Sequence, residues 1–296
     1  MSAPSIVIES DAILPWKQTI VRGVDQHNVA ATGLSDYYPV GFFAYGAADE
    51  VVAGLIGDIW GGRMLVKRLW VAPALRGKGC GAALMARAHK YARRKSCTHA
   101  FLTTNSYEAR PFYERLGYSV YAELKNHPVA PHYRYFMSRS LQDYVDPPER
   151  DIGATIGMDP YPTQTIENVV RDGIGAHANA ALGLPEPQRS AAGFFLREET
   201  GEIVGGVLAN FWGDWMYADL VWVDRALRGK GHATSLMTAA ERNAITRGCE
   251  GAYLSTFSFQ ARPLYEGLGY RVFGEQTDYP KGHSLYHLAK RLVGKA

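Results

Sequence analysis

Residues 70–79 have the sequence WVAPALRGKG, and residues 222–231 have the sequence WVDRALRGKG. Eight of these ten positions are identical, where ordinary residue frequencies would give about one match. The same offset of 152 residues relates ARPFYERLGY at residues 109–118 to ARPLYEGLGY at residues 261–270. A period this long indicates a duplicated domain, because solenoid repeats run to roughly 20–50 residues. The chain is therefore expected to contain two copies of one domain.

Length and composition agree with this duplication. The chain has 296 residues, of which 47% are hydrophobic and 21% charged. At roughly 100–200 residues per domain this length predicts two domains, and the composition excludes disordered, collagen-like and coiled-coil proteins. Pro147 and Pro148 can neither continue a helix nor lie in a central strand, so the boundary is expected near residues 143–151. The predicted domains are residues 1–146 and 151–296.

Charge and cysteine content predict a soluble cytoplasmic protein. The 32 Lys and Arg against 29 Asp and Glu give a net charge of +3, too slight to indicate a nucleic-acid partner. No apolar run approaches the ~18 residues of a membrane-spanning helix, and the N-terminus has no basic leader followed by an apolar stretch. The three cysteines are an odd set without a secretory signal, which indicates reduced thiols. We expect neither a nucleic-acid nor a membrane partner.

The order of the elements can be predicted from apolar patterning and turn residues. In the second copy we expect helices at residues 164–182, 231–247 and 260–267, and strands at residues 193–196, 203–210, 216–223, 252–256, 270–275 and 284–289. The first copy has the same order 152 residues earlier. Strands followed by alternating strands and helices predict a mixed α/β sheet in each copy.

The RGKG sequence lies in each copy between an apolar strand and an amphipathic helix. Small residues at alternating positions of 76–81 and 228–233 let the backbone curl around a ligand, and N–H groups at the following helix N-terminus suit a phosphate or pyrophosphate. A plain tight turn with a solvated basic pair is the alternative. A P-loop is excluded because GxxxxGK followed by Ser or Thr is missing. A dinucleotide fingerprint is excluded because the first acid after Gly79 is Glu108.

Both copies contain Arg-x-x-Gly-x-Gly/Ala after a strand, followed by a helix, a strand and Ala-x-x-x-Tyr-x-x-x-Gly-Tyr. This arrangement resembles the GNAT superfamily of acetyl-CoA-dependent N-acetyltransferases. The resemblance implies two tandem GNAT-like domains, each with a mixed, mostly antiparallel sheet, flanking helices and a splayed central strand. It also implies acetyl-CoA as the cofactor and coenzyme A as a product.

The resemblance assigns cofactor-binding roles to individual residues. Backbone N–H groups of the two loops would bind the pyrophosphate of coenzyme A, and the strand before each loop would pair with the pantetheine arm. A serine stands in each copy where many family members have Asn. The expected cofactor-binding residues are Leu69, Val71, Arg76, Gly77, Lys78, Gly79, Cys80, Gly81 and Ser106 in the first copy, and Val221, Val223, Arg228, Gly229, Lys230, Gly231, His232, Ala233 and Ser258 in the second.

The resemblance also places Tyr113 and Tyr265 where the family has a tyrosine that protonates the departing thiolate. A phenol, with an ordinary pKa of about 10, remains a proton donor at neutral pH. A core or half-buried aromatic residue is the alternative for both tyrosines.

The two copies differ on the strand before the loop, where the second copy has Asp219 and the first has Lys67. Strand alternation places Asp219 on the face of Val221 and Val223. Many GNAT enzymes carry an acid on this strand, as a general base or as an anchor for the substrate ammonium, whereas a lysine would repel a protonated amine. We therefore expect the second copy to catalyse, and the first to bind acetyl-CoA weakly, to shape the substrate cleft, or both. An ion pair of Asp219 with a neighbouring cation is the alternative.

Histidines and aromatic residues near the expected clefts are less informative. Four histidines lie in matching parts of the copies, at His127, His132, His283 and His287. A metal site is not expected because a third and fourth ligand are missing, which leaves residues that line the cleft or satisfied surface histidines. Four aromatic side chains could form an apolar wall or belong to the core, namely Trp60, Trp212, Trp215 and Tyr217.

By its resemblance the protein is expected to move an acetyl group from acetyl-CoA to a primary amine of a small cationic molecule of the antibiotic or polyamine type. One alternative is a non-catalytic acyl-CoA sensor or scaffold, and another is a protein or peptide N-acetyltransferase. The expected partner is a small-molecule amine. The chain would act either as a monomer with pseudo-dimeric domains or as a homodimer.

Overall fold

The computed structural model describes residues 5–10, 14–148, 152–183 and 189–292. Its first sheet contains seven strands: β2 (Tyr38–Tyr45), β3 (Val51–Trp60), β4 (Arg63–Val71), β5 (His99–Asn105), β6 (Ser119–Lys125), β7 (Tyr133–Ser140) and β8 (Thr155–Met158). Its second sheet also contains seven: β1 (Ser5–Ser10), β9 (Arg189–Arg197), β10 (Ile203–Trp212), β11 (Trp215–Val223), β12 (Gly251–Phe257), β13 (Arg271–Gln276) and β14 (Leu285–Arg291).

Six α-helices accompany the sheets in the described part of the chain: α1 (Leu14–Thr32), α2 (Cys80–Arg94), α3 (Arg110–Arg115), α4 (Gln164–Leu182), α5 (His232–Thr246) and α6 (Arg262–Gly267). The predicted helix at residues 164–182 is confirmed at both ends, and the other predicted elements are confirmed with ends moved by a few residues. None of the described helices is long and apolar enough to cross a membrane.

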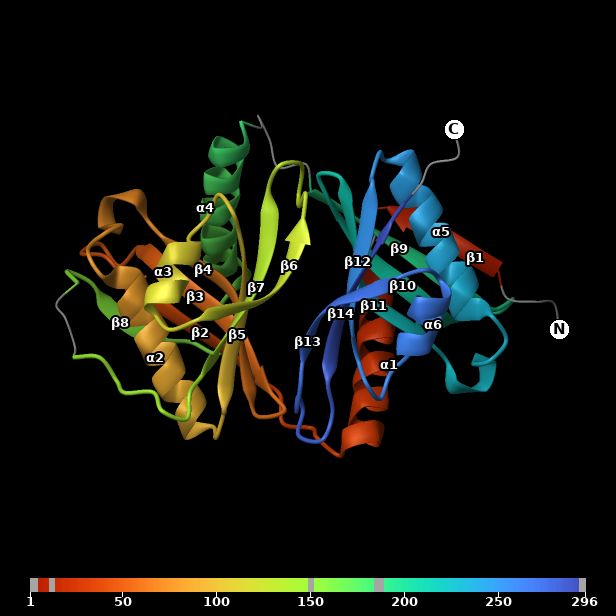
Figure 1. The fold of residues 1–296 in the computed structure, drawn as a ribbon, viewed down its shortest axis with the longest axis horizontal. Coiled ribbons are helices and arrows are strands. Elements are labelled where there is room, and N and C mark those ends of the chain that lie inside the picture. The colour runs from red at the N-terminus through yellow and green to blue at the C-terminus, as the bar shows by residue number, and fades with distance from the viewer. Residues whose placement is uncertain (1–4, 11–13, 149–151, 184–188, 293–296) are drawn as a thin grey trace.

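The strand orders are β6-β7-β5-β4-β3-β2-β8 and β1-β9-β10-β11-β12-β14-β13. Most neighbours are antiparallel, while β4 and β5, and likewise β11 and β12, run parallel. The expectation of two mixed, mostly antiparallel sheets is therefore confirmed. Figure 1 shows the two sheets side by side, with both ends of the chain on the side of the second sheet.

The first strand and the first helix of each sequence copy belong to the sheet that the other copy forms. Strand β1 pairs with β9 of the second sheet, from Ser5 opposite Arg197 to Ser10 opposite Ala192, and β8 pairs with β2 of the first sheet. Helix α1 likewise packs on β10 and β11, and α4 packs on β3 and β4. The predicted boundary thus divides the two copies of the sequence, but each copy gives one strand and one helix to the other sheet.

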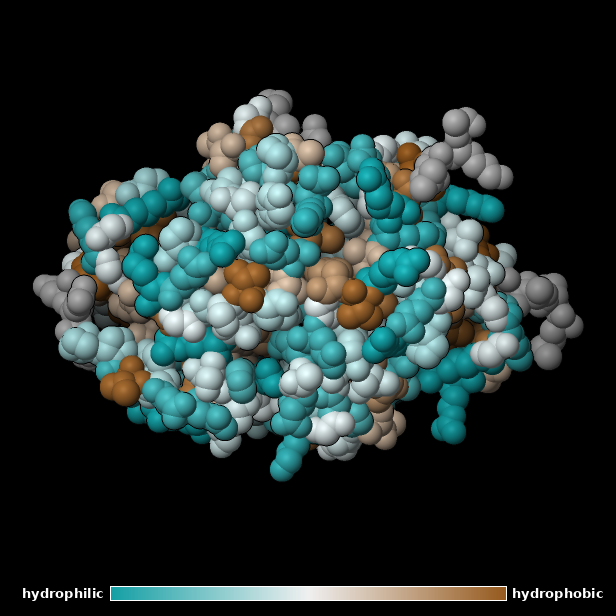
Figure 2. All heavy atoms as spheres, viewed as in Figure 1, coloured by the Kyte–Doolittle hydropathy of each residue, from teal (hydrophilic) through white to brown (hydrophobic). Residues whose placement is uncertain are grey.

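We call the first sheet with α2, α3 and α4 the first unit, and the second sheet with α1, α5 and α6 the second unit. Each has a core between its sheet and one long helix. In α2 the buried residues Cys80, Leu84, Ala88 and Ala92 recur every four positions, so that one stripe faces the sheet. The face of the molecule seen in Figure 2 is mainly hydrophilic, with hydrophobic residues as scattered spots.

The contact between the units has approximate twofold character. The edge strands β6 and β13 pack against each other at Ala122 and Gly274, which are 152 residues apart. On one side Arg63 Nη2 donates a hydrogen bond of 2.7 Å to the carbonyl oxygen of Thr277. On the other side Trp215 Nε1 donates one of 2.6 Å to the carbonyl oxygen of Asn126. The chain therefore forms an internal pseudo-dimer.

Candidate active site

In each sheet a parallel pair of strands separates part-way along its length. The register of β4 and β5 runs from Arg63 opposite His99 to Val66 opposite Leu102, although β4 continues to Val71. The register of β11 and β12 ends in the same way at Ala218 opposite Leu254. Backbone N–H and C=O groups beyond these points are not used between the two strands. The predicted splayed central strand is confirmed in both units.

A β-bulge marks the point of separation. Leu208 lies opposite Leu220 and Ala209 opposite Ala218, so Asp219 is the extra residue of the bulge. Lys67 is the extra residue at the same place in β4. A bulge interrupts strand alternation and re-aims a side chain. The predicted shared face is therefore wrong: Val221 and Val223 pack into the core with Met216 and Ala218, whereas Asp219 is exposed.

The loop after each splayed strand has the conformation that the glycines were expected to provide. Gly77 and Gly79 have φ values of 75° and 87°, and Gly229 and Gly231 have 76° and 82°, a left-handed region that other residues avoid. Gly79 and Gly231 are the N-cap residues of α2 and α5, and neither helix has a side-chain cap. The first N–H groups of both helices thus lack a side-chain acceptor and can receive an anionic ligand.

The arginine of each loop has a structural partner. Arg76 Nε donates a 3.0 Å hydrogen bond to the carbonyl oxygen of Val71, and Arg228 Nε donates one of the same length to that of Val223. Each arginine therefore ties its loop to the end of the splayed strand. In the second unit Arg228 Nη1 also lies 3.4 Å from Nδ1 of His27, which α1 supplies from the start of the chain.

Two cavities of about 930 and 1080 Å³ contain most of the predicted site residues. The first cavity is lined by Leu69, Val71, Arg76, Gly77, Gly79, Cys80, Gly81 and Tyr113. The second is lined by Asp219, Val221, Val223, Arg228, Gly229, Gly231, His232, Ala233 and Tyr265. Four predicted residues are not among the lining residues, namely Lys78, Ser106, Lys230 and Ser258.

The two predicted serines have local partners instead. Ser106 Oγ lies 3.1 Å from Nδ1 of His132, and Ser258 Oγ lies 3.3 Å from Nδ1 of His283. Each serine also accepts a hydrogen bond from a backbone N–H at the start of β7 or just before β14. These contacts hold the turn after the splayed pair, so the serines support the site without lining it.

The far wall of each cavity comes from the other unit. In the first cavity it includes Arg189, Trp212, Trp215 and Tyr217, and in the second it includes Phe136 of β7. Seven residues line both cavities: Val66, Lys67, Arg68, Thr103, Arg134, Tyr217 and Tyr253. The two clefts therefore meet between the units, which sequence patterning within one copy could not indicate. Trp60 lies outside both cavities and packs on Phe257 and Tyr279.

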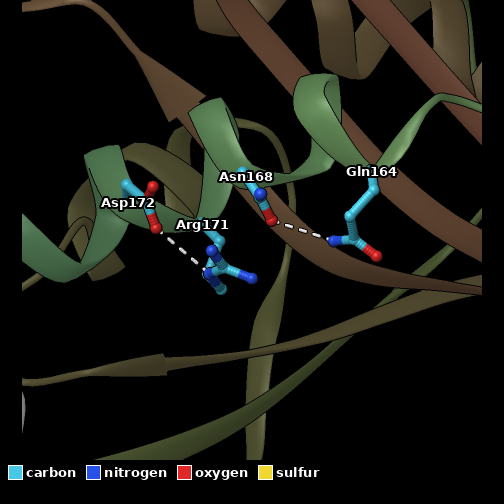
Figure 3. A network of polar contacts seen from close by, with 4 residues as sticks. All are labelled: Gln164, Asn168, Arg171 and Asp172. Carbon is cyan, nitrogen blue, oxygen red and sulfur yellow. Dashed lines mark hydrogen bonds and ion pairs between the residues drawn. The ribbon is translucent and has the colours of Figure 1, made fainter.

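Helix α4 contributes Arg171, Ile174 and His177 to the first cavity. Figure 3 shows the polar contacts along this helix: Arg171 Nε lies 3.1 Å from Oδ1 of Asp172, and Gln164 Nε2 donates a 2.9 Å hydrogen bond to Oδ1 of Asn168. These contacts stay within the helix. The first cavity thus receives side chains from a helix that belongs to the second copy of the sequence.

Both motif tyrosines are buried at the cavity walls, with exposed fractions of 9% for Tyr113 and 6% for Tyr265. Burial raises the pKa of both phenols, so each stays protonated throughout the neutral range. A protonated phenol facing a cavity can donate a proton or a hydrogen bond.

Asp219 is the only acidic side chain among the described residues that line the second cavity. Burial of the site raises its pKa, while Lys17, Lys67 and a 3.5 Å hydrogen bond from Asn210 Nδ2 oppose that rise. Among the described residues no cation lies within ion-pair distance of Asp219, although the charges of Lys17 and Lys67 act on it. Lys67 instead forms its ion pair with Asp58.

Sequence similarity agrees with this geometry. A model of the Acetyltransferase (GNAT) family matches residues 170–270, and one of an Acetyltransferase (GNAT) domain matches residues 39–120. Acetyltransferase Atu2258 of Agrobacterium fabrum is 32% identical over 125 residues, which cover 42% of this chain and 90% of that protein. The chain belongs to the GNAT acetyltransferase family. Its two matched ranges lie in the two copies, so the tandem arrangement is confirmed.

Two further GNAT relatives were found. Blasticidin-S acetyltransferase of Streptomyces morookaense is 38% identical over 95 residues, covering 32% of this chain and 70% of that protein. The crystal structure of an acetyltransferase from Bacillus cereus is 29% identical and covers 45% of this chain and 95% of that one, with a TM-score of 0.41.

GNAT enzymes use acetyl-CoA, and both cavities contain groups that fit it. The uncapped helix N-terminus with its left-handed glycines suits the pyrophosphate, and the unpaired backbone beyond the splay suits an amide-bearing arm. The buried tyrosine lies on the wall of the same cavity.

Two histidines that the sequence left undecided line these GNAT clefts. His127 and His287 are 1% and 5% exposed, so their interpretation as surface residues is wrong, and each lines one of the two cavities. His287 Nε2 lies 2.9 Å from the hydroxyl of Tyr121, and its Nδ1 lies 2.8 Å from Oγ of Ser255. Burial, aided by the charge of Arg134, lowers the pKa of His287 to about 3, so the ring is neutral.

Proposed function

We propose that the protein transfers the acetyl group of acetyl-CoA to a primary amine of a small cationic molecule, and that the second unit is the catalytic one. The observation that carries this proposal is Asp219, a carboxylate with no ion pair among the described residues, in the cavity that is also lined by Tyr265 and most of the loop at residues 228–233. The first unit has Lys67 at the corresponding bulge, already paired with Asp58.

Acetyl transfer requires four tasks, and residues of the second unit perform each of them. Acetyl-CoA supplies the acetyl group as a reactive thioester. Backbone N–H groups of residues 229–233 hold the pyrophosphate, and N–H groups of β11 beyond Ala218 stabilise the negative charge that develops on the carbonyl oxygen. Asp219 attracts the ammonium and first accepts one proton from it, directly or through water, which frees the nitrogen lone pair to form the C–N bond. The second proton that the nitrogen loses as the amide forms restores the phenol of Tyr265, directly or through water. Tyr265 donates its phenolic proton to the sulfur as the C–S bond breaks.

The acceptor is proposed to be an antibiotic-like or polyamine-like amine. The similarity to blasticidin-S acetyltransferase supports a small molecule of antibiotic type. The carboxylate of Asp219, the only acid among the described residues that line a cavity with aromatic walls, supports a cationic group on an apolar or planar body.

Titration calorimetry with acetyl-CoA tests the assignment to one unit. We expect one strong site per chain, lost in Gly231→Val and kept in the matched variant Gly79→Val, because a side chain at either left-handed position distorts its own loop. Two equal sites would contradict catalysis by the second unit alone, and no binding would remove the acetyltransferase assignment for this chain.

Thiol release in the presence of an amine panel then separates an enzyme from a sensor. Aminoglycosides and polyamines are expected to accelerate release from acetyl-CoA, and Tyr265→Phe is expected to abolish most of that acceleration. Binding of acetyl-CoA without release with any amine would support the sensor alternative instead.

A further inference from the structure

The first cavity is lined by more basic than acidic side chains. Glu108 is the only acid among the described residues that line this cavity, and its carboxylate already accepts hydrogen bonds from Thr104 and Asn105. The cations that line it are Lys67, Arg68, Arg76, Arg115, Arg134, Arg171 and Arg189. The loop cation Arg76 lies where coenzyme A phosphates are expected, whereas Arg134 lies on β7 of the first unit and Arg189 on β9 of the second.

These two arginines have no acidic partner within the described part of the chain. Arg189 lies over the ring of Trp212, with its guanidinium carbon 4.0 Å from the ring centre. Arg134 donates a 2.7 Å hydrogen bond from Nη2 to Oγ1 of Thr103, while its buried Nε has no hydrogen-bond partner. The guanidinium carbon of Arg134 lies 6.0 Å from the ring centre of Tyr253. The rings of Tyr253 and Trp212 both lie 5.4 Å from that of His127, so the two arginines flank one aromatic cluster.

A third polar group faces the same region without a partner. His127 is 1% exposed, lines the cavity, and has a buried Nδ1 without a hydrogen bond. Its ring centre lies 5.4 Å from those of Trp212 and Tyr253. Unpartnered donors at an aromatic wall indicate a ligand with an acceptor group and a flat or apolar body.

The second unit lacks this arrangement. Leu285 lies opposite Phe257 as Arg134 lies opposite Asn105, so a leucine takes the place of Arg134. Tyr37 takes the place of Arg189, 152 residues earlier in the sequence. The arginine pair is therefore a property of the first cavity and not of the duplicated fold.

We propose that the first cavity binds the carboxylate of a small aromatic or otherwise apolar acid between Arg134 and Arg189, with the rings of Trp212 and Tyr253 against its body. A guanidinium group presents parallel N–H donors that match a carboxylate. Arg134 lines both cavities, but Arg189 lines only the first, so the arginine pair as a whole belongs to the first cavity, while Asp219 belongs to the second. Binding of the acid requires neither acetyl-CoA nor turnover, so it can be tested independently of the proposed function.

Equilibrium dialysis of the intact protein with radiolabelled benzoate, in the absence of acetyl-CoA, tests this site. Benzoate is expected to bind saturably at one site per chain, and the uncharged isostere benzamide at least about tenfold more weakly, because charge-assisted hydrogen bonds are lost. Arg189→Gln and Arg134→Gln are each expected to weaken benzoate binding about tenfold or more. Arg76→Gln, in the same cavity but at the loop, is the matched control and should bind benzoate like the wild type.

Arg189→Lys separates loss of the ligand from loss of the fold, since it keeps the charge and removes the forked donor. We expect intermediate benzoate affinity for this variant and unchanged circular dichroism for all variants that enter the comparison. The proposal is overturned if the wild type fails to bind benzoate, if benzamide binds equally well, or if Arg189→Gln binds benzoate with wild-type affinity.

Discussion

A single bulge position carries opposite charges in the two copies. Lys67 and Asp219 occupy equivalent bulges, and Asp58 and Asn210 occupy equivalent positions on the neighbouring strand, opposite Leu65 and Tyr217. In the first copy the acid and the base neutralise each other, whereas in the second an amide faces the acid and leaves its charge available. Two substitutions in a duplicated pair of strands are thus enough to create one candidate general base in a chain with two similar clefts.

Replacing Asp219 with Asn is expected to lower acetyl transfer about 100-fold or more, since a general base is lost, and to raise the melting temperature at neutral pH. Desolvation by the surrounding cavity walls raises the pKa of Asp219 above 3.8 although its side chain still reaches solvent, so its ionised form is less favourable in the folded chain than in the unfolded one. The stability gained by Asn should shrink as pH falls towards that raised pKa, because the wild-type side chain then becomes neutral too. Thermal unfolding of both proteins between about pH 5 and 8 measures this. A lower melting temperature for Asp219→Asn throughout that range would contradict the sign.

The matched tyrosines allow a direct comparison of the two units. Tyr265→Phe is expected to lower turnover about 100-fold without changing acetyl-CoA affinity, because only the proton donor is removed. Tyr113→Phe, equally buried in the first cavity, should leave turnover near the wild-type value. Steady-state rates of thiol release with one amine acceptor measure both. Equal losses in the two variants would argue against a single catalytic unit.

At the scale of elements, the sequence predicts the helices and strands that depend on local residue patterns. Apolar spacing, glycines and the duplicated offset place α4, α5 and the strands between them close to their observed ends. The bulge at Asp219 could not be predicted, because a bulge depends on the register of β10 against β11. The sequence also could not predict that β1 and α1 join the second sheet, because an apolar strand pattern does not specify which of two similar sheets the strand will join.

Two glycines of α4 test how closely the exchanged helix approaches its sheet. A Cβ atom at Gly173 would lie 2.0 Å from Nε1 of Trp70, whereas a Cβ atom at Gly175 would meet no atom within 4 Å. Gly173→Ala is therefore expected to destabilise the protein by about 1–3 kcal/mol through overpacking. Gly175→Ala should stabilise it by roughly 0.5–1 kcal/mol, because alanine favours the helix. Urea unfolding measures both, and stabilisation by both alanines would show that α4 does not pack tightly on Trp70.

At the scale of the whole molecule, the exchange makes each cleft depend on both copies. The second cavity draws His27 and Asn28 from α1 and Phe136 from β7, all outside the second copy of the sequence. Removal of α1 would also expose Phe195, which is fully buried beneath Ile20 of that helix. The second sheet therefore needs a helix from outside its own copy to cover it. The isolated second copy contains one such helix, α4, which in the full chain covers the first sheet.

Residues 151–296 alone are expected to form a homodimer in which two chains exchange β8 and α4. The pseudo-twofold contacts permit this symmetry: Gly274, which now meets Ala122, would meet a second Gly274 without a clash. Gly213 lies close to the carbonyl oxygen of Pro128, because it has no Cβ atom. In the homodimer the carbonyl oxygen of Pro280, at the corresponding place in the second copy, would take that position. Sedimentation velocity should show a dimer, and its melting temperature should rise with protein concentration because folding is linked to association. A folded monomer would mean that α4 can close on its own sheet, and that the exchange in the full chain comes from the linkage of the copies and not from the elements themselves.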